Sequence, residues 1–321
     1  MLSGVQPTGD PHIGNYLGAW IRWAREQQPE HFFCIVDLHA ITMPHDPEQL
    51  RDRTVDVACW LYACGLDPAL SALFVQSQVR EHAELAWVLN CVATMGELHR
   101  MTQFKEKSQG RESVSVGLFD YPVLQAADIL LYHAEEVPVG ADQQQHVELT
   151  RDIAQRFNSR YGETLTLPKA TFPTAGARIM DLQLVDKKMS KSLGTAGAIL
   201  LGDTEAQTRK KIMRAVTDSG SEVRAAPDKP GITNLLDLMA AVTGASTQDL
   251  EDHFSGTRYG DFKAEVAEAV NGVVRPVRDR HAELASDLGA VHESLAKGAD
   301  RAREVAAGTM TAVRERVGFL T

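Results

Sequence analysis

Several features that would place this chain in a specialised class are scarce or missing in its 321 residues. No apolar run approaches the roughly 18 residues that span a bilayer. The segment MLSGVQPTGD has neither the basic start nor the apolar core of a signal peptide. Positive charge is not in excess, since the formal net charge is −10, which argues against non-specific wrapping of nucleic acid. We therefore expect a cytoplasmic protein that does not enter a membrane.

Cysteine is also scarce, with four residues: Cys34, Cys59, Cys64 and Cys91. They lie in apolar or helix-like stretches. Cys59 and Cys64 are too far apart for a CxxC pair, and no paired histidines follow them. The sequence predicts buried free thiols and no metal ion held by the protein.

The remaining composition is that of an ordinary globular protein, with 44% hydrophobic and 24% charged residues. The length allows a substantial core and one or two domains. Positive charge is locally dense in KEKSQGR (105–111), KKMSKS (187–192) and TRKKIMR (208–214). Because a large RNA can dock on such local patches of an acidic protein, a nucleic-acid partner stays open.

Strand-like and helix-like segments alternate through the first half of the chain. Strands are predicted at 2–6, 31–41, 71–77 and 135–140 from short apolar, β-rich runs. Helical periodicity and cap signals predict helices at 15–28, with Asn15 as N-cap, and at 46–65, 82–95, 121–134 and 142–162. This rhythm predicts an α/β fold with a doubly wound, Rossmann-like parallel sheet.

The rhythm changes after about residue 195. Helical patterns cover 203–220, 232–244 and 247–256, and two long amphipathic stretches run from Phe262 to the end, without a convincing strand. The sequence therefore predicts a second domain that is all helical.

Polar residues follow several predicted strands, at 6–15, 37–39, Gln76 and 140–143. Ligands of doubly wound sheets bind beyond the carboxyl ends of the strands. We therefore expect these segments to meet at one crevice.

The segment PTGDPHIGN, residues 7–15, is a Pro- and Gly-rich loop before a helix. Small residues allow a phosphate to approach the backbone, and the helix N-terminus favours negative charge. His12 adds a donor for a phosphoryl oxygen, and Asn15 adds a neutral amide. A structural turn between strand and helix would explain the same residues.

The segment KKMSKS carries two lysines three residues apart, Lys188 and Lys191, among small hydroxyl residues. Such a positive clamp suits a triphosphate, whose charge builds on pyrophosphate as it leaves. A solvated basic loop is the alternative, and Lys105 and Lys107, in a predicted loop, are assigned to solvent.

Asp128 lies on an apolar helix, where an isolated buried charge is costly. A ligand N–H would pair it, and so would an ordinary cap or salt bridge. His39 follows a buried strand and is either a core histidine or a ligand contact.

Gly140 and Ala141 end a predicted strand, and Asp142 and Gln143 open the next helix at the crevice. That arrangement suits a ribose hydroxyl or an α-amino group.

Taken in order, the motifs of this chain strongly resemble those of bacterial tryptophanyl-tRNA synthetases, which are class I enzymes. The match runs over nearly the whole chain through PTGDPHIGN, FCIVDLHAIT, ELHRMTQFKEKS, YPVLQAADILLY, VGADQQQHVELTRDIAQRFN, GARIM…KKMSKS, AVTDS and PGITNLL. PTGDPHIGN resembles the HIGH element of the family, in which Asn commonly stands at the fourth place, as Asn15 does here. Residues 188–192 resemble the KMSKS element.

The resemblance implies a two-step reaction. L-Tryptophan reacts with ATP, which carries Mg²⁺ without a dedicated cluster of protein ligands, to give tryptophanyl-adenylate and pyrophosphate. The tryptophanyl group then passes to tRNA-Trp. The resemblance also implies a homodimer, with 83–101 as an interface candidate, although burial within the monomer explains the apolar residues of 83–101 equally well.

The resemblance further implies the domain plan. Residues 1–182 would form the catalytic domain, with the helices of the dimer interface, and 183–200 the KMSKS loop and linker. Residues 201–321 would form a helical anticodon-binding domain whose last helix packs back on the catalytic domain.

Site roles follow from the resemblance residue by residue. The implied catalytic residues are His12, Asn15, Lys188 and Lys191. The implied ATP-binding residues are Gln6, Pro7, Thr8, Gly14, Asn15, Gly140, Ala141, Asp142, Ile179, Lys188, Met189, Ser190, Lys191 and Ser192. The implied tryptophan-binding residues are Asp128, which would accept the indole N–H, and Tyr121, Gln143, His39 and Gln125.

The chain departs from the family pattern at three places. Leu2 replaces a common aromatic residue, Gln125 replaces a methionine usual in bacterial relatives, and LGTAGAI (193–199) replaces a more acidic, Pro-containing segment. These departures concern the pocket and the loop. Three rival functions remain: a tyrosine-specific relative, another nucleotidyltransferase that uses no tRNA, and a non-catalytic paralogue that senses tRNA or tryptophan.

Overall fold

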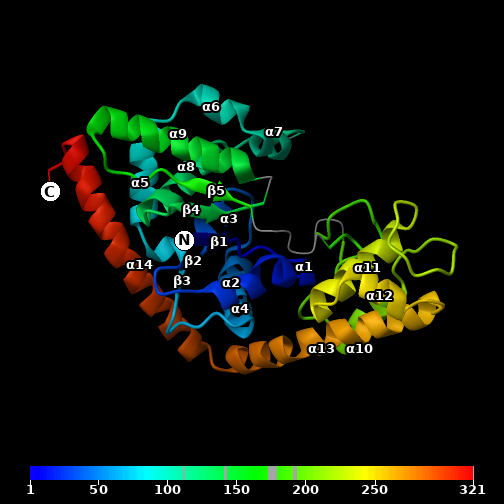
Figure 1. The fold of residues 1–321 in the computed structure, drawn as a ribbon. Helices are drawn as coiled ribbons and strands as arrows, with labels where there is room; N and C mark the ends of the chain where they lie inside the picture. Colours follow the sequence, from blue (N-terminus) through cyan, green and yellow to red (C-terminus); the bar gives the residue numbers. More distant parts are fainter. Residues whose placement is uncertain (111–112, 141–142, 173–178, 191–193, 321) are drawn as a thin grey trace.

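The computed structural model describes residues 1–110, 113–140, 143–172, 179–190 and 194–320. Figure 1 shows two lobes: one holds the N-terminal strands and their helices, and the other is built from helices of the later part of the chain. The last helix, drawn in red, runs along the first lobe, and the C-terminus lies at its outer edge (Figure 1).

A parallel sheet in the order β1-β2-β3 lies at the centre of the first lobe. Its strands are β1 (Leu2–Val5), β2 (Phe32–Ile35) and β3 (Ala72–Val75). β2 and β3 are buried at every position, as their continuous apolar sequences predict for a sheet covered on both faces. The register aligns Val5, Ile35 and Val75, so the polar segments after these residues emerge at one edge.

A second parallel pair, β4 (Glu136–Pro138) and β5 (Lys169–Thr171), packs beside β1. The four predicted strands are therefore confirmed and parallel, but they fall into two sheets rather than one, and the strand predicted at 31–41 ends at Ile35, before a short helix at Asp37–Ala40. β5 was not predicted, because three residues of alternating polarity give almost no sequence signal.

Helices with clear cap signals in the sequence form where they were predicted. Helix α4 (Pro47–Ala63) begins after Asp46, whose carboxylate accepts hydrogen bonds from the backbone N–H groups of Glu48 and Gln49. The other elements of this half are α1 (Ile13–Asn15), a π-helical turn η1 (Tyr16–Trp20), α2 (Ile21–Glu26), α3 (Asp37–Ala40), a 3₁₀ turn η2 (Gln76–Gln78), α5 (Glu81–Asn90), α8 (Val116–Leu131) and α9 (Gln144–Tyr161).

The prediction that Lys105 and Lys107 lie in a loop is wrong. Two short helices, α6 (Met95–Arg100) and α7 (Thr102–Ser108), occupy that part of the chain. Thr94 and Glu97 close a capping box at the start of α6, a signal that the sequence does contain. The Nζ atom of Lys107 lies 4.9 Å from the centre of the Tyr121 ring, although both Lys105 and Lys107 are exposed, as the assignment to solvent predicted.

Among the described residues after β5, secondary structure is helical, as the sequence predicted. The helices are α10 (Glu205–Met213), α11 (Pro230–Thr243), α12 (Thr247–His253), α13 (Tyr259–Ser286) and α14 (Leu288–Val317). Helix α14 packs against β3, and a Cβ added at Gly298 would lie 1.9 Å from the Leu73 carbonyl oxygen. The structure thus brings the C-terminal helix onto the sheet through a position that only glycine fits.

Helices α4 and α13 join the two lobes. The Trp60 ring stacks on the His281 ring with centroids 3.7 Å apart. The Asp56 carboxylate accepts hydrogen bonds from Trp60 Nε1 at 3.1 Å and from His281 Nε2 at 2.7 Å. The α4–α13 contact therefore combines ring stacking with hydrogen bonds to one shared carboxylate.

All four cysteines are free thiols, as predicted, but the predicted burial holds only for Cys34, Cys59 and Cys64. Cys91 follows α5 directly and is exposed, because its apolar neighbours face the core while it faces outward. Within the described ranges, no helix is long and apolar enough to cross a bilayer.

Candidate functional site

The loop at 7–15 leads from β1 into a helix that His12 caps. The His12 Nδ1 atom accepts a hydrogen bond from the Gly14 N–H at 3.1 Å, and the Asn15 carboxamide oxygen accepts one from the His12 N–H at 3.0 Å. The prediction that Asn15 is the N-cap is therefore wrong, because the helix begins at Ile13, two residues earlier than expected. Asn15 instead closes the first turn of that helix from its third position.

Backbone hydrogen bonds tie this loop to the segment that follows KMSKS. The Ile13 N–H donates to the Ile199 carbonyl at 2.8 Å, and the Leu201 N–H donates to the Pro11 carbonyl at 2.9 Å. These bonds surround an antiparallel bridge between His12 and Leu200. The predicted phosphate-binding loop and the segment at 199–201, more than 180 residues apart in sequence, are thus neighbours.

The described start of the KMSKS element is held by a short antiparallel pairing. Met180 and Lys188 form a bridge, and the Met189 N–H donates to the Ile179 carbonyl at 3.0 Å. Met189 and Ile179 are each 2% exposed and belong to the hydrophobic core. Lys188 is exposed and Ser190 half-buried. Lys191 and Ser192 lie outside the described residues.

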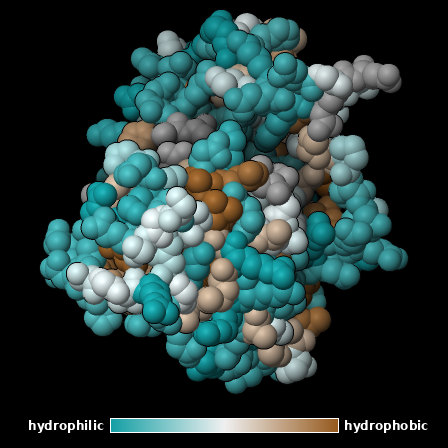
Figure 2. Space-filling view, turned by 90° about the vertical axis from the view of Figure 1, so that its right-hand side faces the viewer, coloured by the Kyte–Doolittle hydropathy of each residue, from teal (hydrophilic) through white to brown (hydrophobic). Residues whose placement is uncertain are grey.

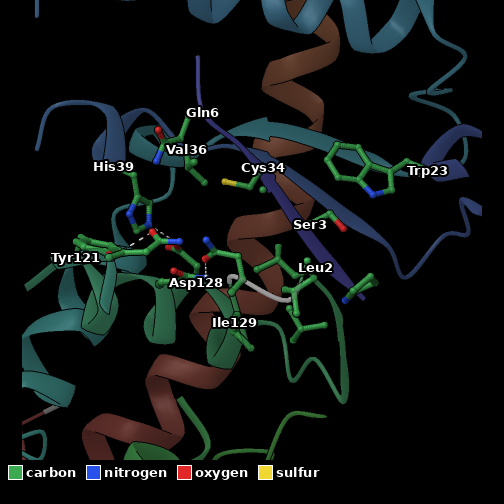
Figure 3. A pocket seen from close by; sticks show the side chains of 18 of the residues that line it. Leu2, Ser3, Gln6, Trp23, Cys34, Val36, His39, Tyr121, Asp128 and Ile129 are labelled. Atoms are coloured by element: carbon green, nitrogen blue, oxygen red, sulfur yellow. Dashed lines mark hydrogen bonds and ion pairs between the residues drawn. The ribbon is translucent and has the colours of Figure 1, made fainter. Parts of the chain in front are cut away.

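A cavity of about 320 Å³ opens beside β1 in the first lobe. Figure 3 shows side chains from β1, β2 and α8 converging on it. The lining includes all five predicted tryptophan-binding residues and two predicted ATP-binding residues: His39, Tyr121, Gln125, Asp128, Gln143, Gln6 and Gly140. Apolar or weakly polar parts of the lining come from Leu2, Trp23, Cys34, Val36, Ile129, Val137, Pro138 and Val139.

Asp128 is the charged group at the closed end of the cavity, and it is 4% exposed. Its Oδ1 atom accepts hydrogen bonds from Gln76 Nε2 and His82 Nδ1, each at 2.6 Å. Its Oδ2 atom accepts one from His39 Nε2 at 2.7 Å (Figure 3). Three donors from different elements therefore hold this carboxylate in one orientation.

Asp128 is ionised at neutral pH. Burial alone would raise the pKa of this carboxyl, but the charge of His39 and the hydrogen bonds from His39 and His82 outweigh burial and hold the pKa well below its usual range. Each carboxylate oxygen has room for about two hydrogen bonds. Within the described part of the chain Oδ1 accepts two and Oδ2 accepts one, so Oδ2 retains capacity for a further donor from the cavity.

Tyr121 lines the same cavity from α8, about two turns before Asp128. Its hydroxyl and His146 Nε2 are 2.9 Å apart, and it donates to Gln103 Oε1 at 3.4 Å. Burial raises the pKa of Tyr121 to about 12, with a smaller contribution from Glu106, so the hydroxyl keeps its proton. Burial also lowers the pKa of Lys107, which lies over the Tyr121 ring.

The entrance of the cavity is formed where β4 ends. The Gln143 N–H donates to the Gly140 carbonyl at 2.9 Å, and Gln125 Nε2 is 3.5 Å from Gln143 Oε1. Ala141 and Asp142 lie outside the described residues. The predicted arrangement of a strand end followed by a helix start is therefore present on both sides of that gap.

Sequence reasoning gave no role to several polar residues of this site. Gln76 was noted only as a strand-end residue, Gln103 and His146 were not noted, and His82 lies in an apolar stretch 46 positions from its partner Asp128. The one usable signal was the buried charge itself, since a carboxylate on an apolar helix requires donors nearby.

The arrangement has two chemically different ends. The enclosed end offers a fixed anionic acceptor among apolar walls, which suits a flat apolar ring that carries one N–H. At the other end the lining includes Gln6 and Gly140, and Gln6 directly precedes the 7–15 loop, whose helix start suits phosphate groups. A ligand that joins an N–H aromatic ring to a nucleotide fits both ends.

The chain belongs to the class I tRNA synthetases of the tryptophan and tyrosine branch. The model of that family, described as tRNA synthetases class I (W and Y), matches residues 1–275.

Similar proteins narrow the branch. The chain is 51% identical to tryptophan–tRNA ligase 2 of Streptomyces avermitilis, over all of this chain and 97% of that protein. The crystal structure of tryptophanyl-tRNA synthetase from Mycoplasma pneumoniae superposes with a TM-score of 0.89 at 35% identity, covering 99% of this chain and 97% of that one. The Campylobacter jejuni enzyme complexed with ADP and tryptophan superposes with a TM-score of 0.87 at 35% identity, covering 99% of both chains.

Proposed function

We propose that this protein is a tryptophan–tRNA ligase that activates L-tryptophan with ATP and transfers it to tRNA-Trp. The observation that carries this proposal is Asp128, an ionised carboxylate in the wall of the cavity with acceptor capacity left on Oδ2. Membership of the tryptophan and tyrosine branch and the relatives named above support the same substrate.

In the first step the indole N–H donates to Asp128 Oδ2, beside His39. Tyr121, Gln143 and Gln125 surround the amino acid backbone and the ring edge. The tryptophan carboxylate oxygen then attacks the α-phosphorus of ATP. The bond from that phosphorus to the β-phosphate oxygen breaks, and pyrophosphate leaves. Positioning and charge stabilisation suffice for this step, which needs no covalent nucleophile from the protein.

The nucleotide occupies the open end. Gln6, Pro7 and Thr8 border its phosphates and adenosine, with Gly14 and Asn15 at the start of the helix and Gly140 to Asp142 near the ribose. Ile179 and Met189, both buried, pack beneath the nucleotide on the adenine side. His12 and the lysines of KMSKS stabilise the charge that develops on pyrophosphate, and Mg²⁺ arrives with ATP as part of the substrate.

In the second step a ribose hydroxyl at the end of tRNA-Trp attacks the adenylate carbonyl carbon, and AMP leaves. The helical part from 201 onward binds the anticodon region of the tRNA. Figure 2 looks onto this lobe and shows polar side chains over most of its face, with hydrophobic ones gathered near the centre. A polar face of this kind suits a nucleic acid partner. We place the enzyme in the cytoplasm with that substrate.

The functional unit is a homodimer. Trp87 on α5, Met95 on α6 and Val116 on α8 are 70%, 66% and 79% exposed, and α8 packs against both α5 and α6. Large apolar side chains so exposed on neighbouring helices favour a protein partner, and 83–101 holds two of them. Sedimentation at low concentration tests this: a dimer is expected for the wild type and a monomer for Trp87→Lys.

ATP–pyrophosphate exchange with each amino acid tests the proposed reaction. Exchange is expected with tryptophan and not with tyrosine, and tryptophan is then expected on tRNA-Trp in a charging assay. Exchange with tyrosine and none with tryptophan would assign the enzyme to the tyrosine-specific half of the branch.

Lys191→Ala is expected to slow adenylation. An unchanged rate would show that this lysine does not stabilise the triphosphate.

A further inference from the structure

On the side away from the cavity, the carboxylate of Asp128 is hydrogen-bonded to a buried residue, which is itself hydrogen-bonded to a second one. Neither of these two residues lines the cavity. His82 on α5 is 0% exposed and Tyr132, just after α8, is 8% exposed. His82 Nδ1 faces Asp128 Oδ1 at 2.6 Å, and His82 Nε2 faces the Tyr132 hydroxyl at 2.8 Å. A series of hydrogen bonds therefore leads from Asp128 in the cavity wall through His82 to Tyr132 in the interior.

The direction of each hydrogen bond follows from the chemistry of its ends. An ionised carboxylate only accepts, so His82 Nδ1 must carry the proton and donate to Asp128. The Tyr132 hydroxyl is available to donate to Nε2, because burial, with the nearby Cys34 and Asp128 as smaller causes, raises the pKa of Tyr132 far above its usual range. A hydroxyl that donates to Nε2 selects the imidazole tautomer that donates from Nδ1.

Packing holds both rings in place. The Tyr132 ring stacks on Phe32 of β2 with centroids 4.7 Å apart, and the His82 ring lies 5.8 Å from Phe74 of β3. The sheet thus fixes the two rings, and the rings fix the carboxylate. This link connects the strands at the centre of the fold to the orientation of one acceptor in the cavity.

The consequence for recognition lies in the division between the two carboxylate oxygens. His82 and Gln76 together fill the hydrogen-bonding capacity of Oδ1. Acceptor capacity therefore remains on Oδ2, where His39 also donates. Without the bond from His82, Oδ1 would regain an acceptor position and the carboxylate could rotate.

Building on the proposed function, we propose that His82 and Tyr132 are positioning residues that determine tryptophan specificity by directing Asp128 Oδ2 toward the indole N–H. They touch no substrate and act only through Asp128. Their effect is therefore confined to amino acids that carry a ring N–H.

The test compares tryptophan with an analogue in which the sulfur of a benzothiophene replaces the indole N–H. ATP–pyrophosphate exchange is measured for the wild type, Tyr132→Phe, His82→Gln and His82→Asn. Asparagine can place a donor near the Nδ1 position and serves as the conservative rescue, whereas glutamine carries its amide further out. Tyr62→Phe on α4 is the matched control, because it removes a buried hydroxyl that does not border the cavity.

We expect Tyr132→Phe and His82→Gln to raise the KM for tryptophan about tenfold, with kcat changed much less. The same variants are expected to leave the analogue within about twofold of the wild type. His82→Asn should recover most of the tryptophan affinity, and Tyr62→Phe should change neither substrate. Thermal unfolding of each variant checks that the protein compared is folded, and Tyr132→Phe alone decides the matter if His82→Gln does not fold.

Equal losses for tryptophan and the analogue in the folded variants would overturn the proposal, since they would indicate a general structural role. An unchanged KM for tryptophan in Tyr132→Phe would overturn it as well. Failure of the proposed function looks different, because the wild type itself would then show no tryptophan-dependent exchange or no preference for tryptophan over the analogue.

Discussion

The two ends of the site are built in opposite ways. At the amino acid end, Asp128 is buried and accepts three side-chain hydrogen bonds from three separate elements. At the nucleotide end, Lys188 is exposed, and backbone hydrogen bonds join the His12 loop to the segment at 199–201. The first end is therefore organised before any ligand binds, whereas at the second end the backbone is placed and the charged side chain is still solvated.

This difference has a physical reason. A flat ring with a single N–H offers little to select by, so discrimination requires a buried acceptor that becomes unpaired when the wrong ring binds. A triphosphate carries enough charge to draw exposed lysines toward it, and stabilisation is needed only as pyrophosphate leaves. Rigid placement serves the first task, and exposed charge serves the second.

The largest effect is expected from a substitution at the amino acid end of the site. Asp128→Asn removes the charge and places an N–H₂ group among donors, so we expect kcat/KM for tryptophan in the exchange assay to fall about 10²–10³-fold. Asp120→Asn is the matched control, because Asp120 lies on the same helix, bonds to Asn90 and does not border the cavity. A similar loss in both variants would mean that α8, rather than the Asp128 carboxylate, is what tryptophan binding requires.

The next largest effect is expected from a substitution at the nucleotide end of the site. Lys188→Ala should lower kcat of exchange about 10- to 100-fold while the KM for tryptophan stays near that of the wild type. Lys187→Ala is the neighbouring control, since this lysine is exposed and pairs with Asp186 at 3.7 Å. If both variants behave alike, general positive charge and not the clamp position accounts for the rate.

A smaller effect sharpens the comparison at the cavity entrance. Gln125→Met restores the residue usual in bacterial relatives and removes the contact with Gln143. We expect the KM for tryptophan to change by no more than about fivefold, with kcat unaltered, because the two side chains have similar volumes. A large fall in kcat would show that Gln125 acts on the reacting groups instead.

The smallest effect concerns acid stability and the sign of two pKa shifts on one helix. The pKa of Asp128 is lowered in the folded protein, so its charge stabilises the fold above about pH 4 and this contribution is lost as the pH falls. Burial raises the pKa of Asp120, opposed by its bond to Asn90, so its contribution is present at low pH and lost as the pH rises. Urea unfolding from pH 3 to pH 7 should show Asp128→Asn losing most at pH 7 and Asp120→Asn losing least there. Parallel curves for the two variants would contradict these signs.

The sequence predicted those features that depend on local signals. Continuous apolar runs such as 32–35 and 72–75 produced correct strands, and the Asp-Pro start at Asp46 placed α4, because these signals are local. The five tryptophan-binding residues suggested by the resemblance all line one cavity. Their individual roles remain predictions.

The errors and omissions concern interactions that are not local. Asn15 was predicted as the cap, but His12 caps the helix through its own ring nitrogen. Lys107 is exposed, as predicted, but its ammonium group also lies over the ring of a tyrosine 14 residues away, a contact that was not foreseen. His82 was not noted, because its partners come from another helix and no pattern within its own helix reveals them. Pairings across elements are set by the fold, and a single sequence does not display them.

The most direct test of the central claim is calorimetric titration of the wild type with tryptophan, and separately with tyrosine, in the absence of ATP. A preorganised amino acid end predicts that tryptophan binds without nucleotide, with the same Kd in Lys188→Ala, and that tyrosine does not bind. Tryptophan binding that appears only when ATP is present, or binding of tyrosine as tight as that of tryptophan, would contradict the account.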